Sequence, residues 1–334
     1  MNQNKFQNKF ALTAIAALAA TVLAAAQAAA PTEPAAKPVL TVSPAERLSA
    51  ATGVKILAAS RAGGRIVAVG DHGVVLLSDD QGKTYRQAAT VPVSSTLTAV
   101  TFVDDRNGWA VGHWGAILKT SDAGQTWSLQ RSDFQADQPL FSVHFKNASE
   151  GWAVGLWSLM LHTSDGGASW APVALPPPPN AKKADRNLYA IFSDAKGGLF
   201  ITSEQGRVLR SQDDGKTWTY AETGYGGSFW SGAALKDGTL LVGGLRGTIY
   251  RSTDCGDSWQ AAKTGLKSSV TAIAQRAGGP VLAVGLDGMT LESSDGGLSF
   301  SGSQRPDRAA LTAVLDGPAG GAAVLFSTRG PVVK

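Results

Sequence analysis

Six aspartates with the same neighbours recur along the chain, and their carboxylates are the first candidates for chemistry in this sequence. Each stands in an octet of the pattern Ser/Thr-x-Asp-x-Gly-x-Ser/Thr-aromatic, and successive aspartates are 42, 43, 48, 41 and 41 residues apart. A carboxylate in such a turn accepts hydrogen bonds from the amides that follow it, and the glycine permits a positive φ. The pattern therefore predicts six structural hairpin corners rather than six acid–base sites. The aspartates are Asp80, Asp122, Asp165, Asp213, Asp254 and Asp295.

Few other residues are arranged for catalysis. The carboxylates of Asp71, Glu204 and Asp287 are predicted to share one face, where a close pair could hydrolyse a glycoside, but their separation along the chain places them far apart around that face. Cys255 is the single cysteine, so it forms no internal disulfide, and no neighbouring residue is placed to act as its base. We therefore predict no enzyme activity, no cofactor and no metal. The histidines, which lack metal-ligand spacing, are His72, His113, His144 and His162.

The strands that position these residues repeat as well. A short apolar strand is followed by a turn, a second strand, a two-residue turn, a third strand and the octet, in seven units of about 40 residues. Four short strands per unit of this length are typical of a β-propeller blade. The sequence therefore predicts an all-β, seven-bladed β-propeller of four-stranded antiparallel blades. The first strands of the units begin at Val54, Leu97, Leu140, Leu188, Phe229, Val270 and Leu311.

The seventh unit ends before it reaches an octet or a fourth strand. An open ring would leave an unpaired strand edge, which favours aggregation. We therefore expect Val39 to Val42 to supply the missing outer strand and close the ring, so that the propeller spans residues 39–334.

The N-terminus reads as an export signal. Lys5 and Lys9 precede an Ala/Leu-rich stretch and a small-residue cleavage site, so residues 1–28 are predicted to be a cleaved signal peptide and residues 29–38 a flexible Ala/Pro-rich linker. The mature protein is then periplasmic or secreted. The formal charge of +4 falls by two when these lysines are removed, which is too small a charge to indicate nucleic-acid binding.

Functional residues are expected on the face where the turns between second and third strands emerge. Trp114 and Trp157 occupy equivalent turns of neighbouring blades, and exposed tryptophan is typical of a protein-interaction hot spot. Trp109, Trp152 and Trp230 are instead expected to pack in the core. The candidate partner-binding face consists of His72, His113, Trp114, Trp157, Glu204, Arg246, Asp287 and Arg329.

The octet resembles the Asp box, or bacterial neuraminidase repeat, which lies at the outer rim of propellers and away from ligand. The runs 107–127 and 150–155 contain Gly-Trp-Ala-Val-Gly, which is similar to the repeat of the photosystem II stability/assembly factor family. That resemblance covers essentially the whole mature chain. It implies a non-enzymatic propeller, which in the photosynthetic members of the family holds a nascent membrane subunit at the lumenal surface. The family's basic patch has no matching motif here, so none of its residues is carried over.

We therefore expect a periplasmic, monomeric, protein-binding assembly or accessory factor for a membrane complex, peripheral to the membrane at most. A glycan-binding or sialidase/glycoside-hydrolase-like propeller is the first alternative, although the chain has only five tyrosines and lacks an Arg-Ile-Pro stretch. A structural scaffold without a defined pocket is the second.

Overall fold

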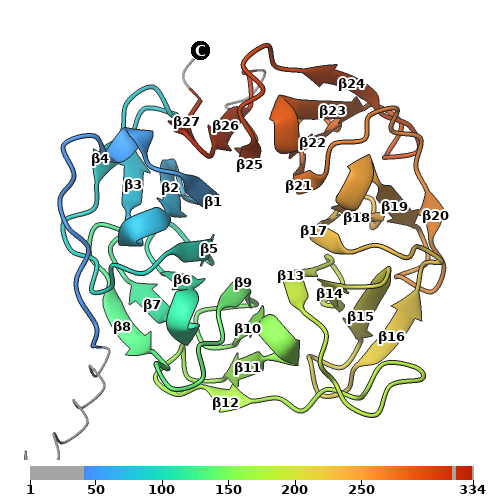
Figure 1. The fold of residues 1–334 in the computed structure, drawn as a ribbon, viewed down its shortest axis with the longest axis horizontal. Helices are drawn as coiled ribbons and strands as arrows, with labels where there is room; N and C mark the ends of the chain where they lie inside the picture. Colours follow the sequence, from blue (N-terminus) through green and yellow to red (C-terminus); the bar gives the residue numbers. More distant parts are fainter. Residues whose placement is uncertain (1–40, 318–320, 333–334) are drawn as a thin grey trace, which may run out of the picture. The chain divides into compact units, whose positions relative to one another are not determined.

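The computed structural model describes residues 41–317 and 321–332. The predicted signal peptide (1–28), the predicted linker (29–38), Val39 and Leu40 lie outside the described residues. Seven antiparallel sheets stand around a central channel, which confirms the predicted seven-bladed β-propeller (Figure 1). Within the described ranges, no helix has the length and apolar character needed to span a membrane.

Each blade begins at the channel with an inner strand, and the second strand pairs with it. The inner strands are β1 (Ile56–Ala62), β5 (Leu97–Phe102), β9 (Leu140–Phe145), β13 (Leu188–Ser193), β17 (Phe229–Ala234), β21 (Val270–Gln275) and β25 (Leu311–Leu315). The second strands are β2 (Arg65–Gly70), β6 (Gly108–Gly112), β10 (Gly151–Gly155), β14 (Leu199–Ser203), β18 (Leu240–Gly244), β22 (Val281–Gly285) and β26 (Val324–Ser327).

The third and outer strands complete the blades toward the rim. The third strands are β3 (Val75–Ser78), β7 (Ile117–Thr120), β11 (Met160–Thr163), β15 (Arg207–Ser211), β19 (Ile249–Ser252), β23 (Met289–Ser293) and β27 (Gly330–Pro331). The outer strands are β4 (Arg86–Gln87), β8 (Ser128–Arg131), β12 (Ala171–Pro172), β16 (Thr219–Glu222), β20 (Gln260–Ala261) and β24 (Ser301–Gln304). One-turn 3₁₀ helices are η1 (Ala51–Gly53), η2 (Asp71–Gly73), η3 (His113–Gly115), η4 (Leu156–Ser158), η5 (Leu245–Gly247) and η6 (Leu286–Gly288).

The core lies between neighbouring blades, because each sheet buries both faces against the next. Trp109 of β6 is fully buried and stacks on Phe145 of β9, with ring centroids 3.5 Å apart. Trp152 of β10 is 1% exposed and packs with Leu188 and Ile201 of the following blade. Trp109 and Trp152 are therefore core residues, as predicted.

The predicted N-terminal closing strand is wrong for its described residues. Thr41 and Val42 belong to no strand, and the described part of the seventh sheet contains only β25, β26 and β27. The chain that follows lies along blade 1 instead, where the Ala45 amide donates to the Val91 carbonyl at 2.9 Å. The place beside β27 is taken by η1, whose Thr52 carbonyl approaches Gly330 so closely that a Cβ there would lie 1.8 Å away.

Blades 7 and 1 are joined by side chains. The Thr312 hydroxyl of β25 donates to the Ile56 carbonyl of β1 at 2.6 Å, and Phe326 packs edge-on against Tyr85 with ring centroids 6.1 Å apart. The same threonine bond joins blades 2 and 3, where Thr98 reaches the Leu140 carbonyl at 2.6 Å. The closing interface is therefore built like an internal one.

Replacing Thr312 with alanine is expected to lower the free energy of unfolding by about 1 kcal/mol, because the Ile56 carbonyl loses a donor in a partly buried interface. Urea denaturation measures the change. Thr312→Ser keeps the hydroxyl and should behave like the wild type. Thr271→Ala removes the equivalent bond between blades 6 and 7. If Thr271→Ala lowers the free energy of unfolding and Thr312→Ala does not, Thr312 does not hold the ring closed.

All six octets form the same hydrogen-bonded corner between the third and outer strands. In the first, the Ser78 and Thr84 hydroxyls donate to the two carboxylate oxygens of Asp80 at 2.8 and 2.6 Å, and the Gly82 amide donates to the Ser78 hydroxyl at 2.8 Å. Each aspartate thus uses its carboxylate within its own turn, which is the structural role expected of it. The equivalent bonds in the other corners centre on Asp122, Asp165, Asp213, Asp254 and Asp295.

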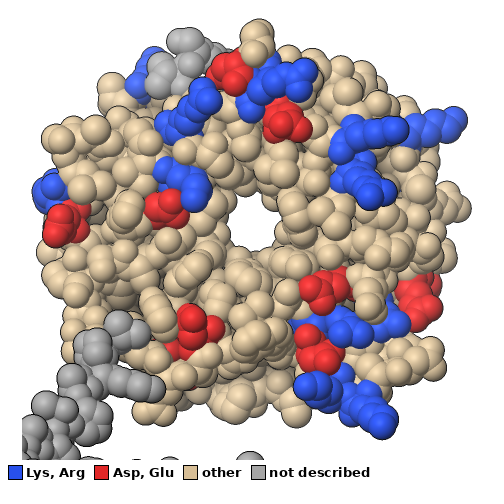
Figure 2. Space-filling view, in the orientation of Figure 1, with Lys and Arg blue, Asp and Glu red and all other residues tan. Residues whose placement is uncertain are grey.

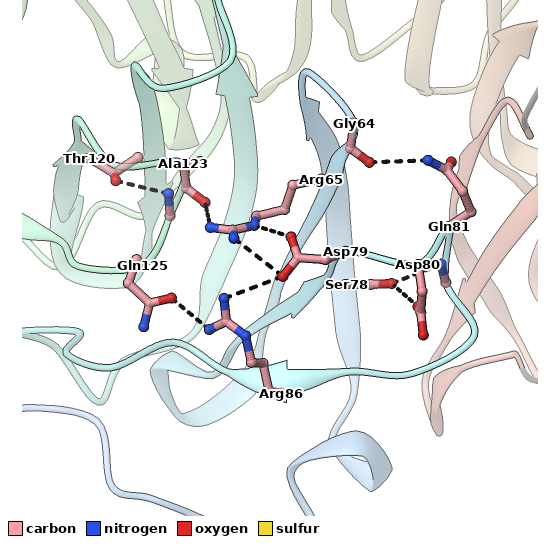
Figure 3. A network of polar contacts seen from close by, with 12 residues as sticks. Gly64, Arg65, Ser78, Asp79, Asp80, Gln81, Arg86, Thr120, Ala123 and Gln125 are labelled. Carbon is pink, nitrogen blue, oxygen red and sulfur yellow. Dashed lines mark hydrogen bonds and ion pairs between the residues drawn. The ribbon is translucent and has the colours of Figure 1, made fainter.

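Figure 3 shows how the first corner is joined to blade 2. Arg65 and Arg86 converge on the Asp79 carboxylate at 2.5 and 3.5 Å. Arg86 also donates to the Gln125 side chain at 2.6 Å, and Arg65 donates to the Ala123 carbonyl at 3.4 Å. The octets therefore contribute to cohesion between blades, at the ends of the third strands that lie away from the candidate binding face.

Acid should destabilise the octets only at low pH. Hydrogen bonds from Thr84 and Ser78 lower the pKa of Asp80 to about 2. Because this pKa is depressed in the folded state, the stabilisation is complete above the ordinary aspartate value and is lost as the pH falls through the folded pKa. We expect the Tm of Asp80→Asn to fall less than that of the wild type between about pH 4 and pH 2. Asp105→Asn removes an exposed carboxylate outside the octets and should follow the wild type; equal slopes for all three would contradict the prediction.

Candidate binding face

Six turns between second and third strands share an unusual backbone. The residue at each tip and the one after it both have positive φ, as in a type I′ turn, which favours Asn, Asp or Gly at the tip. Only Asp287 follows this preference. Bulky side chains at such a position cost roughly 1–2 kcal/mol of backbone strain, so turn formation does not account for them. The tips, with φ between 53° and 59°, are His72, Trp114, Trp157, Gln205, Arg246 and Asp287.

The Trp157 turn is the most constrained of the six. Trp157 is 59% exposed and is followed by Ser158, where the other five turns have glycine. The long link before blade 4 holds this turn: the Ser158 amide donates to the Arg186 carbonyl at 2.7 Å, and the Trp157 amide donates to the Asn187 side chain at 3.1 Å. The fold therefore fixes the backbone that carries an exposed indole, and this indole contributes little to the core.

Trp114 differs from Trp157. It is half-buried, its ring lies 5.6 Å from that of Phe134, and both line a cavity of about 260 Å³ beside Thr41 and Val42. The cavity lies between the blade 2 turn and the N-terminal segment. The structure thus places the two tryptophans on equivalent turns but gives only Trp157 a largely free ring.

The other predicted face residues are spread around the ring. His72, His113, Arg246, Asp287 and Arg329 are exposed. Figure 2 shows Lys/Arg and Asp/Glu side chains scattered over this face, in mixed groups in several places and as a basic group at the upper right, with mostly uncharged surface next to the channel.

The three carboxylates considered for glycoside hydrolysis stand on blades 1, 4 and 6. Asp71 pairs with Lys55 at 2.9 Å, Glu204 accepts from Asn187 at 2.9 Å, and Asp287 accepts from Ser268 at 2.9 Å. Each is engaged separately, so the structure brings no acid–base pair together from this set.

The described residues contain no cluster of His, Cys, Asp and Glu that could hold a metal. His144 lies on β9, where burial lowers its pKa to about 4. His162 lies on β11, with Nε2 3.4 Å from a Glu150 carboxylate oxygen.

Every inner strand has a β-bulge at its second residue, a feature that re-aims side chains. Threonines at this position bond to the next blade, whereas blades 3 to 5 carry half-buried aromatic rings. Phe141 and Tyr189 stack at 5.9 Å, and Trp230 lies outside the buried clusters, so the expectation that it packs in the core does not hold. We call Phe141, Tyr189 and Trp230 the aromatic arc. The seven bulge residues are Leu57, Thr98, Phe141, Tyr189, Trp230, Thr271 and Thr312.

The aromatic arc was not among the residues predicted from the sequence. Phe141 and Tyr189 follow the first apolar residue of their inner strands, and Trp230 does the same in the next blade. Comparing that single position across the seven repeats would have revealed three consecutive aromatic residues.

Seven antiparallel sheets around a channel define a seven-bladed β-propeller. Residues 86–241 match the family described as photosynthesis system II assembly factor YCF48. The resemblance predicted from the Gly-Trp-Ala-Val-Gly repeats is thus confirmed over that stretch.

Solved structures share the fold. The chain is similar to YCF48 bound to a D1 peptide, with 19% identity, a TM-score of 0.66, and coverage of 84% of this chain and 92% of that one. YCF48 from Cyanidioschyzon merolae has 14% identity, a TM-score of 0.65 and coverage of 84% and 94%. The propeller domain of Cps50 (Swd1) from Myceliophteria thermophila has 14% identity, a TM-score of 0.66 and coverage of 83% and 94%. No curated protein matches the chain.

Proposed function

We propose that this protein is a non-enzymatic, periplasmic propeller that binds another protein as an assembly or accessory factor for a membrane complex. The observation that carries the proposal is the exposed Trp157 ring at a strained turn tip, where the Trp157 amide donates a hydrogen bond to Asn187 of the next inter-blade link. Rigid, accessible tryptophan is the residue most typical of binding hot spots.

The similar structure described as YCF48 bound to a D1 peptide supports a polypeptide ligand. The separate engagement of the three face carboxylates supports binding rather than glycoside hydrolysis. Export is supported by the leader, and N-terminal sequencing of the protein purified from cells should begin after residue 28 if cleavage occurs as predicted.

Photocrosslinking tests the binding face. A benzophenone amino acid in place of Trp157, in the full chain in its native cells, is expected to crosslink a membrane-complex subunit. The matched control is Leu298, a 52% exposed apolar residue in the sixth octet, on the other side of the blades. Equal crosslinking from both positions, or none from position 157, would contradict the proposal.

A further inference from the structure

Glu204 is a carboxylate without a cationic partner among the described residues. Its Oε1 accepts from the Asn187 side-chain amide at 2.9 Å and from the Tyr189 hydroxyl at 3.3 Å, both neutral donors. Its Oε2 accepts no hydrogen bond from the described part of the chain. By contrast, Asp71, at the same point of the blade 1 turn, pairs with Lys55 at 2.9 Å. Glu204 is thus held in place with one oxygen available.

Two arginines near Glu204 in the sequence, one on the link before blade 4 and one on β15, pair with other carboxylates. Arg186 pairs with Asp185 at 2.8 Å, and Arg207 pairs with Glu222 at 3.5 Å on the outer strand. The negative charge of Glu204 is therefore not neutralised by an ion pair within its own blade.

The aromatic arc adjoins this carboxylate. The Tyr189 hydroxyl touches Glu204, Phe141 stacks against Tyr189 with an angle of 16° between ring planes, and Trp230 occupies the equivalent bulge of the next blade. Aromatic rings attract cations through their negative faces, and a guanidinium can stack on a ring while its edge bonds a carboxylate. A carboxylate beside aromatic rings thus has the composition of an arginine receptor.

We propose that the aromatic arc and Glu204 receive one arginine side chain of a polypeptide partner at the channel mouth, between blades 3 and 5. The proposal rests on the proposed function in taking the ligand to be a polypeptide, and it adds the chemistry that the partner must carry. An acidic segment would face repulsion from Glu204, and a neutral saccharide would leave this charge unmatched.

The test uses the mature protein and a blocked Gly/Ser hexapeptide with one central arginine. Binding is followed through the indole N–H resonance of Trp230, assigned by its loss in Trp230→Phe. We expect a saturable shift with this peptide and none with the same peptide carrying citrulline, which has the shape of arginine without its charge. Glu204→Gln should weaken binding by about tenfold or more, since it removes the charge and retains the hydrogen-bond acceptor.

Glu222→Gln is the matched control, because it makes the same substitution on the outer strand of the same blade, and it should leave the affinity unchanged. If Glu204→Gln alters the melting curve, Phe141→Leu tests the same site by removing a ring of the aromatic arc while keeping the Trp230 reporter, and it should weaken binding by a similar factor.

Three results would overturn the inference: equal binding of the citrulline peptide, equal weakening by Glu204→Gln and Glu222→Gln, or a Trp230 shift produced by maltotriose instead. The outcome is separable from that of the proposed function. If position 157 crosslinks a partner but Glu204→Gln does not change the binding of the arginine peptide, the proposed function is supported and the arginine site is not. If the arginine peptide binds as expected but position 157 crosslinks no partner, the arginine site is supported and the proposed function is not.

Discussion

Trp157→Gly should weaken partner binding by about 30-fold or more while leaving the fold at least as stable as before. Truncation of a hot-spot tryptophan costs about 2 kcal/mol or more of binding free energy. Glycine relieves the positive φ of 53° at this position, and the lost ring is mostly exposed, so the free energy of unfolding should stay equal or rise by up to about 1 kcal/mol.

Affinity for the crosslinked partner and urea denaturation measure the two effects. Ser158→Gly is the control, because it relieves the neighbouring strained residue, φ 59°, without removing the indole. It should keep full binding. Loss of stability together with binding in Trp157→Gly would mean that the tryptophan serves the fold, and unchanged binding would remove it from the interface.

Gly155→Ala should destabilise the protein by about 3 kcal/mol or more. Gly155 closes a Gly-Trp-Ala-Val-Gly run and pairs with Leu140 beside the bulge at Phe141. A Cβ on Gly155 would lie 2.1 Å from the Pro139 carbonyl oxygen, an overlap with backbone that no rotamer can relieve. The expected loss arises from the bulge and not from φ, which is in the extended region at −167°.

Urea and thermal denaturation measure this loss, with Gly278→Ala as the control. A Cβ on Gly278 would meet its nearest neighbour, in Pro280, at an ordinary 3.8 Å. If Gly155→Ala were as stable as Gly278→Ala, the backbone at Pro139 would have to move away from the added methyl group at little cost. The bulge could then not be a rigid support for the aromatic arc.

The repeats predicted the blades because each repeated residue has a local task. Asp80 and its equivalents close a corner with bonds to neighbours within four residues, and this can be recognised without the rest of the fold. The same holds for the turn tips, whose position follows from the strand order. Seven blades, their octets and the face carrying Trp157 could therefore be predicted.

Features that depend on distant contacts could not be predicted. The N-terminal segment follows blade 1 because the Ala45 amide bonds to the Val91 carbonyl, on the link between blades 1 and 2. In addition, η1 occupies the edge of β27. The residues next to Val42 in the sequence do not indicate either contact. Trp230 was expected to pack in the core because it lies on an inner strand. A bulge shifts the alternation of side chains by one residue, so the side that Trp230 faces was not determined by its position in the pattern.

The threonine bond between blades 7 and 1 also has a mechanical consequence. At every other junction the main chain passes from one sheet to the next, whereas blades 7 and 1 are joined by non-covalent contacts such as those of Thr312 and Phe326. The propeller ring can therefore open between blades 7 and 1 without breaking a covalent bond. Amide exchange should consequently begin in β25 and β1 before it reaches the sheets on the opposite side, and pulling the two termini apart should peel the end blades away first.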